Sequence, residues 1–127
     1  MKKETTHWYE LAKRDWEMMT LSWDHHKYAY AVMFAQQAVE KIIKAYIIEY
    51  TKKVPRKIHI IEELIKDAKL DLKEIASPNV KELSKAYARV RYPDLSKTYY
   101  ESRSEVEKLI VMAKAVYLWI EKKLKQS

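Results

Sequence analysis

The stretch Phe34-Ala35-Gln36-Gln37-Ala38-Val39-Glu40-Lys41-Ile42-Ile43-Lys44-Ala45 lies inside a helical pattern that runs from about Tyr28 to Tyr50. Its apolar residues recur at three- and four-residue spacing, which is typical of one face of a helix. Ala31, Ala35 and Ala38 fall on that face and are small, so a second helix can approach closely there. We therefore expect the central helix of an all-helical bundle, with every other helix packed against it.

The remaining helices are expected at about Thr6–Leu21, His59–Ala68, Pro78–Arg91 and Ser102–Leu124. Hydroxyl and carboxylate side chains at helix starts accept the unpaired amide hydrogens of a first turn. This rule assigns caps to Thr5 or Thr6, Asp24 and Ser77, and a capping box to Ser102 with Glu105. The sequence predicts an up-and-down bundle of four main helices plus a short extra helix, forming one domain over residues 1–127.

The chain contains neither cysteine nor glycine. These absences exclude disulfides, thiolate metal sites and glycine-rich phosphate loops. They also predict turns built from Pro, Asp, Asn and Ser, without positive φ. No apolar run reaches the roughly 18 residues that cross a membrane, and no leader is recognisable. We expect a cytoplasmic protein without cofactor or metal, and the wealth of Lys and Glu is typical of a heat-adapted source.

The net charge of +7 is unevenly distributed. Residues 1–50 carry seven basic and seven acidic side chains, whereas residues 51–127 carry eighteen and eleven. Such an imbalance indicates an acidic partner, for example nucleic acid or nucleotide phosphates. The alternative interpretation is that lysine-rich helices serve solubility alone.

Basic and aromatic residues are interleaved around the third proline of the chain. They are Tyr87, Arg89, Arg91, Tyr92, Lys97, Tyr99, Tyr100 and Arg103. Arginine holds phosphate oxygens in bidentate fashion, and tyrosine faces can stack on bases. The alternative is that the tyrosines fill gaps between helices and that Arg91 pairs with Asp94 to fix the helix exit.

Four segments in the right order resemble the HEPN domain family of small helical proteins. They are Trp8-to-Trp16, Tyr28-to-Ala45, Pro55-to-Leu64 and the Arg91-Tyr92-Pro93-Asp94 element. The resemblance implies a helical bundle, a homodimer and a role involving nucleotide or RNA. It also implies a minimal nucleotidyltransferase partner, in a two-component or toxin–antitoxin pair.

Many ribonucleases of this family carry an arginine followed, after four to six intervening residues, by a histidine. Here the positions after Arg91 are Ser96, Lys97 and Thr98, so the motif is absent. The resemblance therefore implies a binding module more than an enzyme. The expected nucleotide- or phosphate-binding residues are Arg91, Tyr92, Asp94, His59, Lys41 and Gln37.

Two alternatives remain open. One is a metal-independent ribonuclease with a variant site, in which Arg91 would stabilise the phosphorane and His59, Tyr92 or Asp94 would move the proton. The other is a purely structural dimeric protein whose interface is the aromatic face of the first helix, with Trp8, Trp16 and Trp23.

Overall fold

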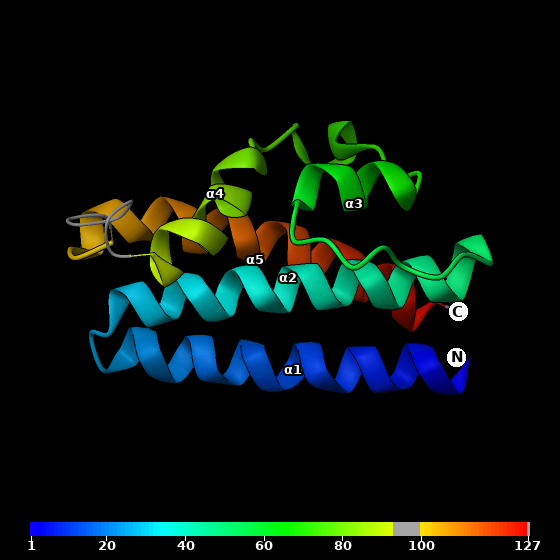
Figure 1. Cartoon of the computed structure of the whole chain (residues 1–127), viewed down its shortest axis with the longest axis horizontal. Coiled ribbons are helices and arrows are strands. Elements are labelled where there is room, and N and C mark those ends of the chain that lie inside the picture. Colours follow the sequence, from blue (N-terminus) through cyan, green and yellow to red (C-terminus); the bar gives the residue numbers. More distant parts are fainter. Residues whose placement is uncertain (93–99, 127) are drawn as a thin grey trace.

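The computed structural model describes residues 1–92 and 100–126. Over these residues the chain is helical and has no β-strand, as the sequence predicts. Figure 1 shows the helices in chain order. They are α1 (Lys3–Asp24), α2 (Tyr28–Thr51), α3 (Ile61–Asp67), the 3-10 helix η1 (Leu72–Ile75), α4 (Lys81–Arg91) and α5 (Arg103–Lys125).

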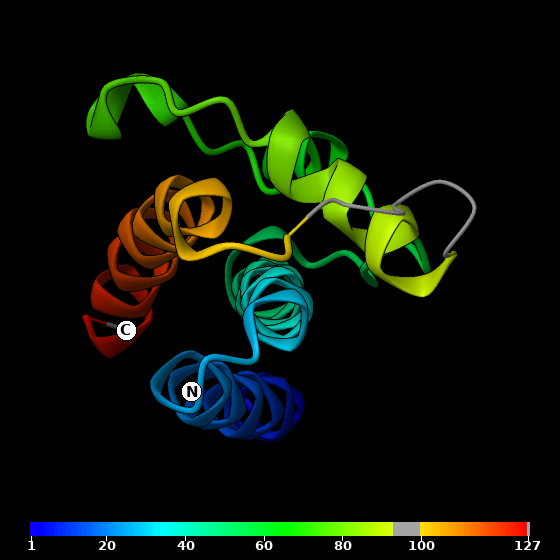
Figure 2. The same cartoon turned by 90° about the vertical axis from the view of Figure 1, so that its left-hand side faces the viewer.

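Helix α2 lies at the centre of the bundle (Figure 2). Helix α1 runs antiparallel to α2, and α5 runs parallel to it on another side (Figure 1). Helices α3 and α4 cover a further side, and all four of these α-helices contact α2. The predicted central role of this segment is confirmed for the α-helices, whereas η1 contacts α5.

Burial extends around most of the circumference of α2. The three alanines of the expected face have no exposed surface, and neither has Ile43 on another side. Three polar side chains of α2 are buried as well: Gln36, Glu40 and Lys44 are 0%, 7% and 5% exposed. Because little water reaches these side chains, any of their polar atoms that lacks a protein partner is costly.

The tryptophans of α1 contribute to the fold itself. Trp16 stacks on Tyr117 of α5, with ring centroids 4.3 Å apart. Trp8 packs against the core and lies under Lys44, while Trp23 makes an edge contact with Tyr28. All three are partly buried within one chain, where they contribute to the packing of α1.

Several predicted helix starts differ from the observed ones. Helix α1 begins at Lys3, so Thr5 lies inside the helix and is buried. Asp24 ends α1 instead of capping α2, whose N-cap is Lys27. Helix α4 begins at Lys81, four residues beyond Ser77.

The capping box of α5 is confirmed in its first half. The Ser102 hydroxyl accepts a hydrogen bond from the Glu105 amide at 3.4 Å. The second half differs. In a standard capping box the Glu105 carboxylate would accept a hydrogen bond from the amide of Ser102, whereas here it accepts one from the amide of Tyr100 at 3.0 Å.

The start of α1 and the end of α2 cap each other. The Glu49 carboxylate of α2 accepts hydrogen bonds from the Lys2 amide at 3.0 Å and the Thr5 hydroxyl at 2.9 Å. In return, the Lys2 ammonium donates to the Ile48 carbonyl at 2.9 Å. The hydrogen bond from the Lys2 amide is the main reason why the pKa of Glu49 lies below its usual value.

The prediction that turns avoid positive φ is wrong. Six residues other than glycine adopt it in the described part of the chain: His26, Lys52, Lys69, Ala76, Ser77 and Tyr100. Several of them follow the last turn of a helix, where the left-handed conformation ends helical bonding. A β-carbon makes this conformation costly by about 1–2 kcal/mol per residue.

None of the described helices combines the length and apolar composition that are needed to cross a bilayer.

We expect Ala35→Leu to destabilise the protein by about 1–3 kcal/mol, because the added carbons have no room beside the fully buried Ala35. The matched control is Ala115→Leu on the exposed side of α5, where a larger side chain is tolerated. Urea unfolding followed by circular dichroism measures both. Equal stability of the two variants would contradict close packing at Ala35.

We expect Glu49→Gln to lower stability by about 1 kcal/mol near neutral pH, because a neutral amide is a weaker acceptor for Lys2 and Thr5. The lowered pKa of Glu49 stabilises the fold above the unfolded-state pKa, near 4.5. That stabilisation disappears as the pH falls through the folded-state pKa. The difference between variant and wild type should therefore shrink on acidification, and a constant difference in urea unfolding would contradict the assignment.

Candidate functional site

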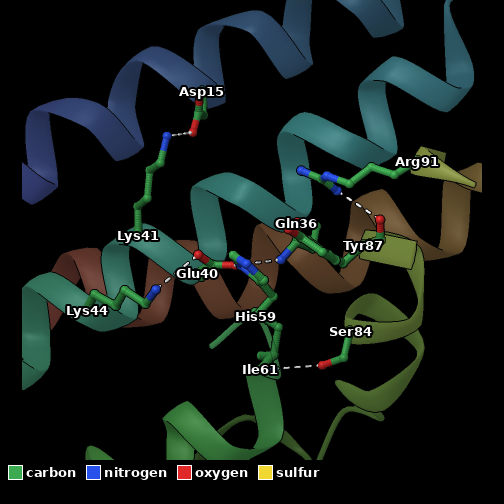
Figure 3. Close-up of polar contacts among 10 residues, drawn as sticks. All are labelled: Asp15, Gln36, Glu40, Lys41, Lys44, His59, Ile61, Ser84, Tyr87 and Arg91. Carbon is green, nitrogen blue, oxygen red and sulfur yellow. Dashed lines mark hydrogen bonds and ion pairs between the residues drawn. The ribbon is translucent and has the colours of Figure 1, made fainter. Parts of the chain in front are cut away.

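Arg91 is the last residue of α4 and folds back onto Tyr87 one turn earlier (Figure 3). Its Nη1 donates a hydrogen bond to the Tyr87 carbonyl at 2.9 Å. The guanidinium carbon lies 3.7 Å from the centroid of the Tyr87 ring, a cation–π contact. Both contacts arise because residues four apart lie on the same side of a helix. The guanidinium is thus held in one orientation at the end of α4.

His59 lies in the segment between α2 and α3 and stacks on the same tyrosine. The rings of His59 and Tyr87 have centroids 3.9 Å apart and an angle of 11° between their planes. Two planar groups this close to one ring would overlap if they shared a face. Tyr87 is therefore held between His59 on one face and Arg91 on the other, which brings together two of the residues that the sequence predicts for the site.

The imidazole of His59 is oriented by Glu40 of α2. Its Nδ1 lies 2.9 Å from Glu40 Oε1 (Figure 3). A carboxylate oxygen can only accept, so Nδ1 is the donor and Nε2 of the neutral ring is the acceptor. The Glu40 side chain is 9% exposed and that of His59 is 46% exposed. A buried carboxylate thus orients the ring of a half-exposed histidine.

Glu40 also bonds to its neighbours on α2. Gln36 Nε2 donates to Oε1 at 3.0 Å, and Lys44 Nζ donates to Oε2 at 3.2 Å. These residues are spaced by four, so they form a row along one side of the helix (Figure 3). The opposite charge of Lys44 and the three donors together compensate the burial of the Glu40 carboxylate.

Gln36 leaves one buried acceptor unsatisfied. Its Nε2 is fixed towards Glu40, and its Oε1 has no hydrogen-bond donor among the described residues. A buried polar atom without a partner costs about 1–3 kcal/mol. The row of polar residues is therefore not fully satisfied within the described chain.

Lys41 points to a different neighbour. Its Nζ forms an ion pair with Asp15 of α1 at 2.6 Å, and in Figure 3 this pair lies apart from Arg91 and His59. The two side chains are 26% and 14% exposed. Lys41 therefore links α1 to α2 in this structure.

The other predicted site residues occupy varied positions. Tyr92 caps the end of α4 and is 53% exposed. Gln37 is partly exposed, while its neighbour Gln36 joins the polar row. Asp94 lies outside the described residues, so the predicted pairing of Asp94 with Arg91 is not tested.

Neighbouring arginines are paired with carboxylates. Arg56 lies in a basic loop at residues 52–57 and binds Asp67 at 2.7 Å and Glu63 at 3.2 Å, which directs this loop towards α3. Arg89 lies 3.8 Å from Glu82. The pKa of Glu82 is below its usual value, mainly because Lys85 donates a hydrogen bond to it. Within residues 1–92 and 100–126, Arg91 has no carboxylate partner.

Sequence reasoning missed two contributors, Glu40 and the ring of Tyr87 as a platform. Signals for both exist in the sequence. Gln36, Glu40 and Lys44 are spaced by four on a largely apolar helix, and Tyr87 and Arg91 are also four apart. No group of three or more metal-binding side chains gathers anywhere in the described part of the chain.

We compared the chain with known proteins. The family model described as HEPN domain matches residues 5–123. Among solved structures, the chain is similar to the crystal structure of TT1696 from Thermus thermophilus, with 26% sequence identity and a TM-score of 0.78. The alignment covers 96% of this chain and 99% of that chain. No curated protein matches.

The family match spans nearly the whole bundle, from the first turn of α1 to the last turns of α5. It includes every element that builds the site: α2 with Glu40, the segment with His59, and α4 with Arg91. The chain therefore belongs to the HEPN domain family.

Proposed function

We propose that this HEPN protein is a binding module for the phosphate groups of a nucleotide or RNA, and that Arg91 is the principal phosphate ligand. The observation that carries the proposal is the stack of Arg91, Tyr87 and His59. It holds a guanidinium that has no carboxylate partner among the described residues beside a histidine whose side chain is 46% exposed.

The geometry suits an anion for a physical reason. One Arg91 nitrogen bonds to the Tyr87 carbonyl, which leaves the other donors of the guanidinium to bind phosphate oxygens. Because the stack limits the motion of Arg91, less conformational entropy is lost when a ligand binds. Tyr92 and Asp94 remain proposed secondary contributors.

Family membership also supports two proposals about partners. One is a minimal nucleotidyltransferase protein, and the other is a second copy of this chain. Exposed apolar side chains on α1 and α5, such as Leu21, Val111 and Leu118, are 52%, 62% and 45% exposed and are compatible with a homodimer. Co-purification with the product of a neighbouring gene tests the first proposal, and light scattering tests the second.

We expect Arg91→Ala to weaken binding of nucleotides or short RNAs by at least about tenfold, because a charge-assisted hydrogen bond to phosphate is lost. Arg91→Lys should weaken it less, since charge remains but the planar fork is lost. Arg14→Ala, which removes an exposed arginine from α1, is the control. Fluorescence anisotropy measures binding, and equal affinity of Arg91→Ala and wild type would contradict the proposed site.

A ribonuclease activity is the second candidate, and the Glu40–His59 pair is the observation that favours it. His59 Nε2 can accept the proton of an RNA 2′-hydroxyl, whose oxygen then attacks the adjacent phosphorus. The 5′-oxygen leaves with a proton from solvent, and a 2′,3′-cyclic phosphate remains. Arg91 would stabilise the charge on the phosphorane. Glu40 would act through His59 as a positioning residue.

We expect that, if purified protein cleaves RNA, His59→Gln lowers the cleavage rate by about 10²–10⁴-fold, because the general base is lost. Binding of uncleavable 2′-deoxy RNA analogues should change far less. EDTA should not affect the rate. Gel analysis of labelled RNA measures cleavage. Undiminished cleavage by His59→Gln would exclude this mechanism, and inactive wild type would leave the binding module as the function.

A further inference from the structure

A second basic region lies where α1 starts and α2 ends. An open cavity of about 360 Å³ lies there, lined by Lys2 and Lys3 from the start of α1 and by Lys52 and Lys53 after the end of α2. Glu4, Ile48 and Val54 complete the lining. Small-molecule sites commonly have volumes of about 300–1,000 Å³, so the cavity is large enough for a ligand.

The four lysines lack carboxylate ion-pair partners among the described residues. Lys2 Nζ donates to the Ile48 carbonyl, and in the described part of the chain none of the four ammonium groups forms an ion pair with a carboxylate. Arg56, a few residues further on in the same basic loop, pairs with Asp67 and Glu63 instead. The lysines that line the cavity thus remain available while the neighbouring arginine is occupied.

The local charge balance favours a multivalent anion. The lining contains four lysines and one glutamate, and the Glu49 carboxylate lies beside Lys2, so the positive charges outnumber the negative ones. Like charges around a shared cavity repel each other, and an anion between them removes that repulsion. The first turn of α1 adds the positive partial charge of a helix start.

We propose that this cavity binds an oligophosphate chain, through Lys3, Lys52 and Lys53 with support from Lys2. A chain of linked phosphates carries several negative charges along its length. It can therefore contact lysines that come from two separate parts of the protein. Val54 is 89% exposed at the rim and offers apolar contact to a nucleobase. The chain can therefore come from a nucleoside triphosphate or from free inorganic oligophosphate.

This site is separate from Arg91. In Figure 1 the start of α1 and the end of α2 lie at one end of the bundle, and the end of α4 lies towards the other end. The proposal does not depend on the function assigned to Arg91. Ligand binding that survives Arg91→Ala but is lost with the lysines belongs to the cavity.

The test is titration of wild type and Lys52→Gln/Lys53→Gln with inorganic tripolyphosphate and with ATP by isothermal calorimetry. Both lysines are exposed, and neither side chain bonds to another described residue, so the variant should fold normally. Lys114→Gln/Lys122→Gln removes the same charge from exposed positions on α5. Circular dichroism confirms that every variant is folded.

We expect the Lys52/Lys53 double variant to bind tripolyphosphate at least about tenfold more weakly than wild type. The Lys114/Lys122 variant should bind it as wild type does. Tighter binding of ATP than of tripolyphosphate assigns a nucleotide, and equal binding assigns the phosphate chain alone. The proposal fails if wild type binds neither ligand, or if both double variants lose affinity equally. It also fails if RNA without a terminal triphosphate binds through these lysines as tightly as ATP.

Discussion

The burial of α2 on most of its circumference is the constraint on which the rest of the structure depends. A helix surrounded by four others must place its polar side chains where water cannot solvate them. Gln36, Glu40 and Lys44 meet this requirement by bonding to one another along one side. The buried carboxylate of Glu40 has capacity for a further donor and takes it from His59. The core thereby determines the orientation of a surface residue.

This dependence links core packing to the candidate site. His59 is anchored by α2 below and stacks on Tyr87 of α4 beside it, so two separate elements fix its position. Arg91 is in turn placed by the same ring. Sites built on rigid helices hold their geometry more precisely than sites on loops. The Gln36 side-chain carbonyl lies within this assembly and lacks a hydrogen-bond donor among the described residues.

The sequence predicted the architecture well because α2 and α5 have long, regular apolar patterns. Helix starts were predicted less well, since caps such as Asp24 and Ser77 were judged from residue type alone. The actual start of α1 is capped from another helix by Glu49, a tertiary contact without a local signal. The absence of glycine was misleading for the same reason, because packing holds other residues at positive φ.

The candidate site was predicted in part. Arg91 and His59 were identified from charge and family likeness, and the structure brings them to one tyrosine. Their approach depends on how the segment before α3 runs back along α2 towards α4 (Figure 1), which no short-range pattern encodes. Lys41 was a reasonable candidate by charge, but Asp15 lies across the α1–α2 contact and pairs with it. Pairing of this kind is decided by which helices become neighbours.

Both ends of the chain lie at the same end of the bundle, close to the lysine-lined cavity and away from the end of α4 (Figure 1). An affinity tag or fusion partner on either end therefore emerges beside that cavity. When the protein is immobilised on a surface through such a tag, the end that carries Arg91 faces solvent and the end with the lysine-lined cavity is crowded. Ligand binding to the cavity would then be underestimated in measurements on tethered protein.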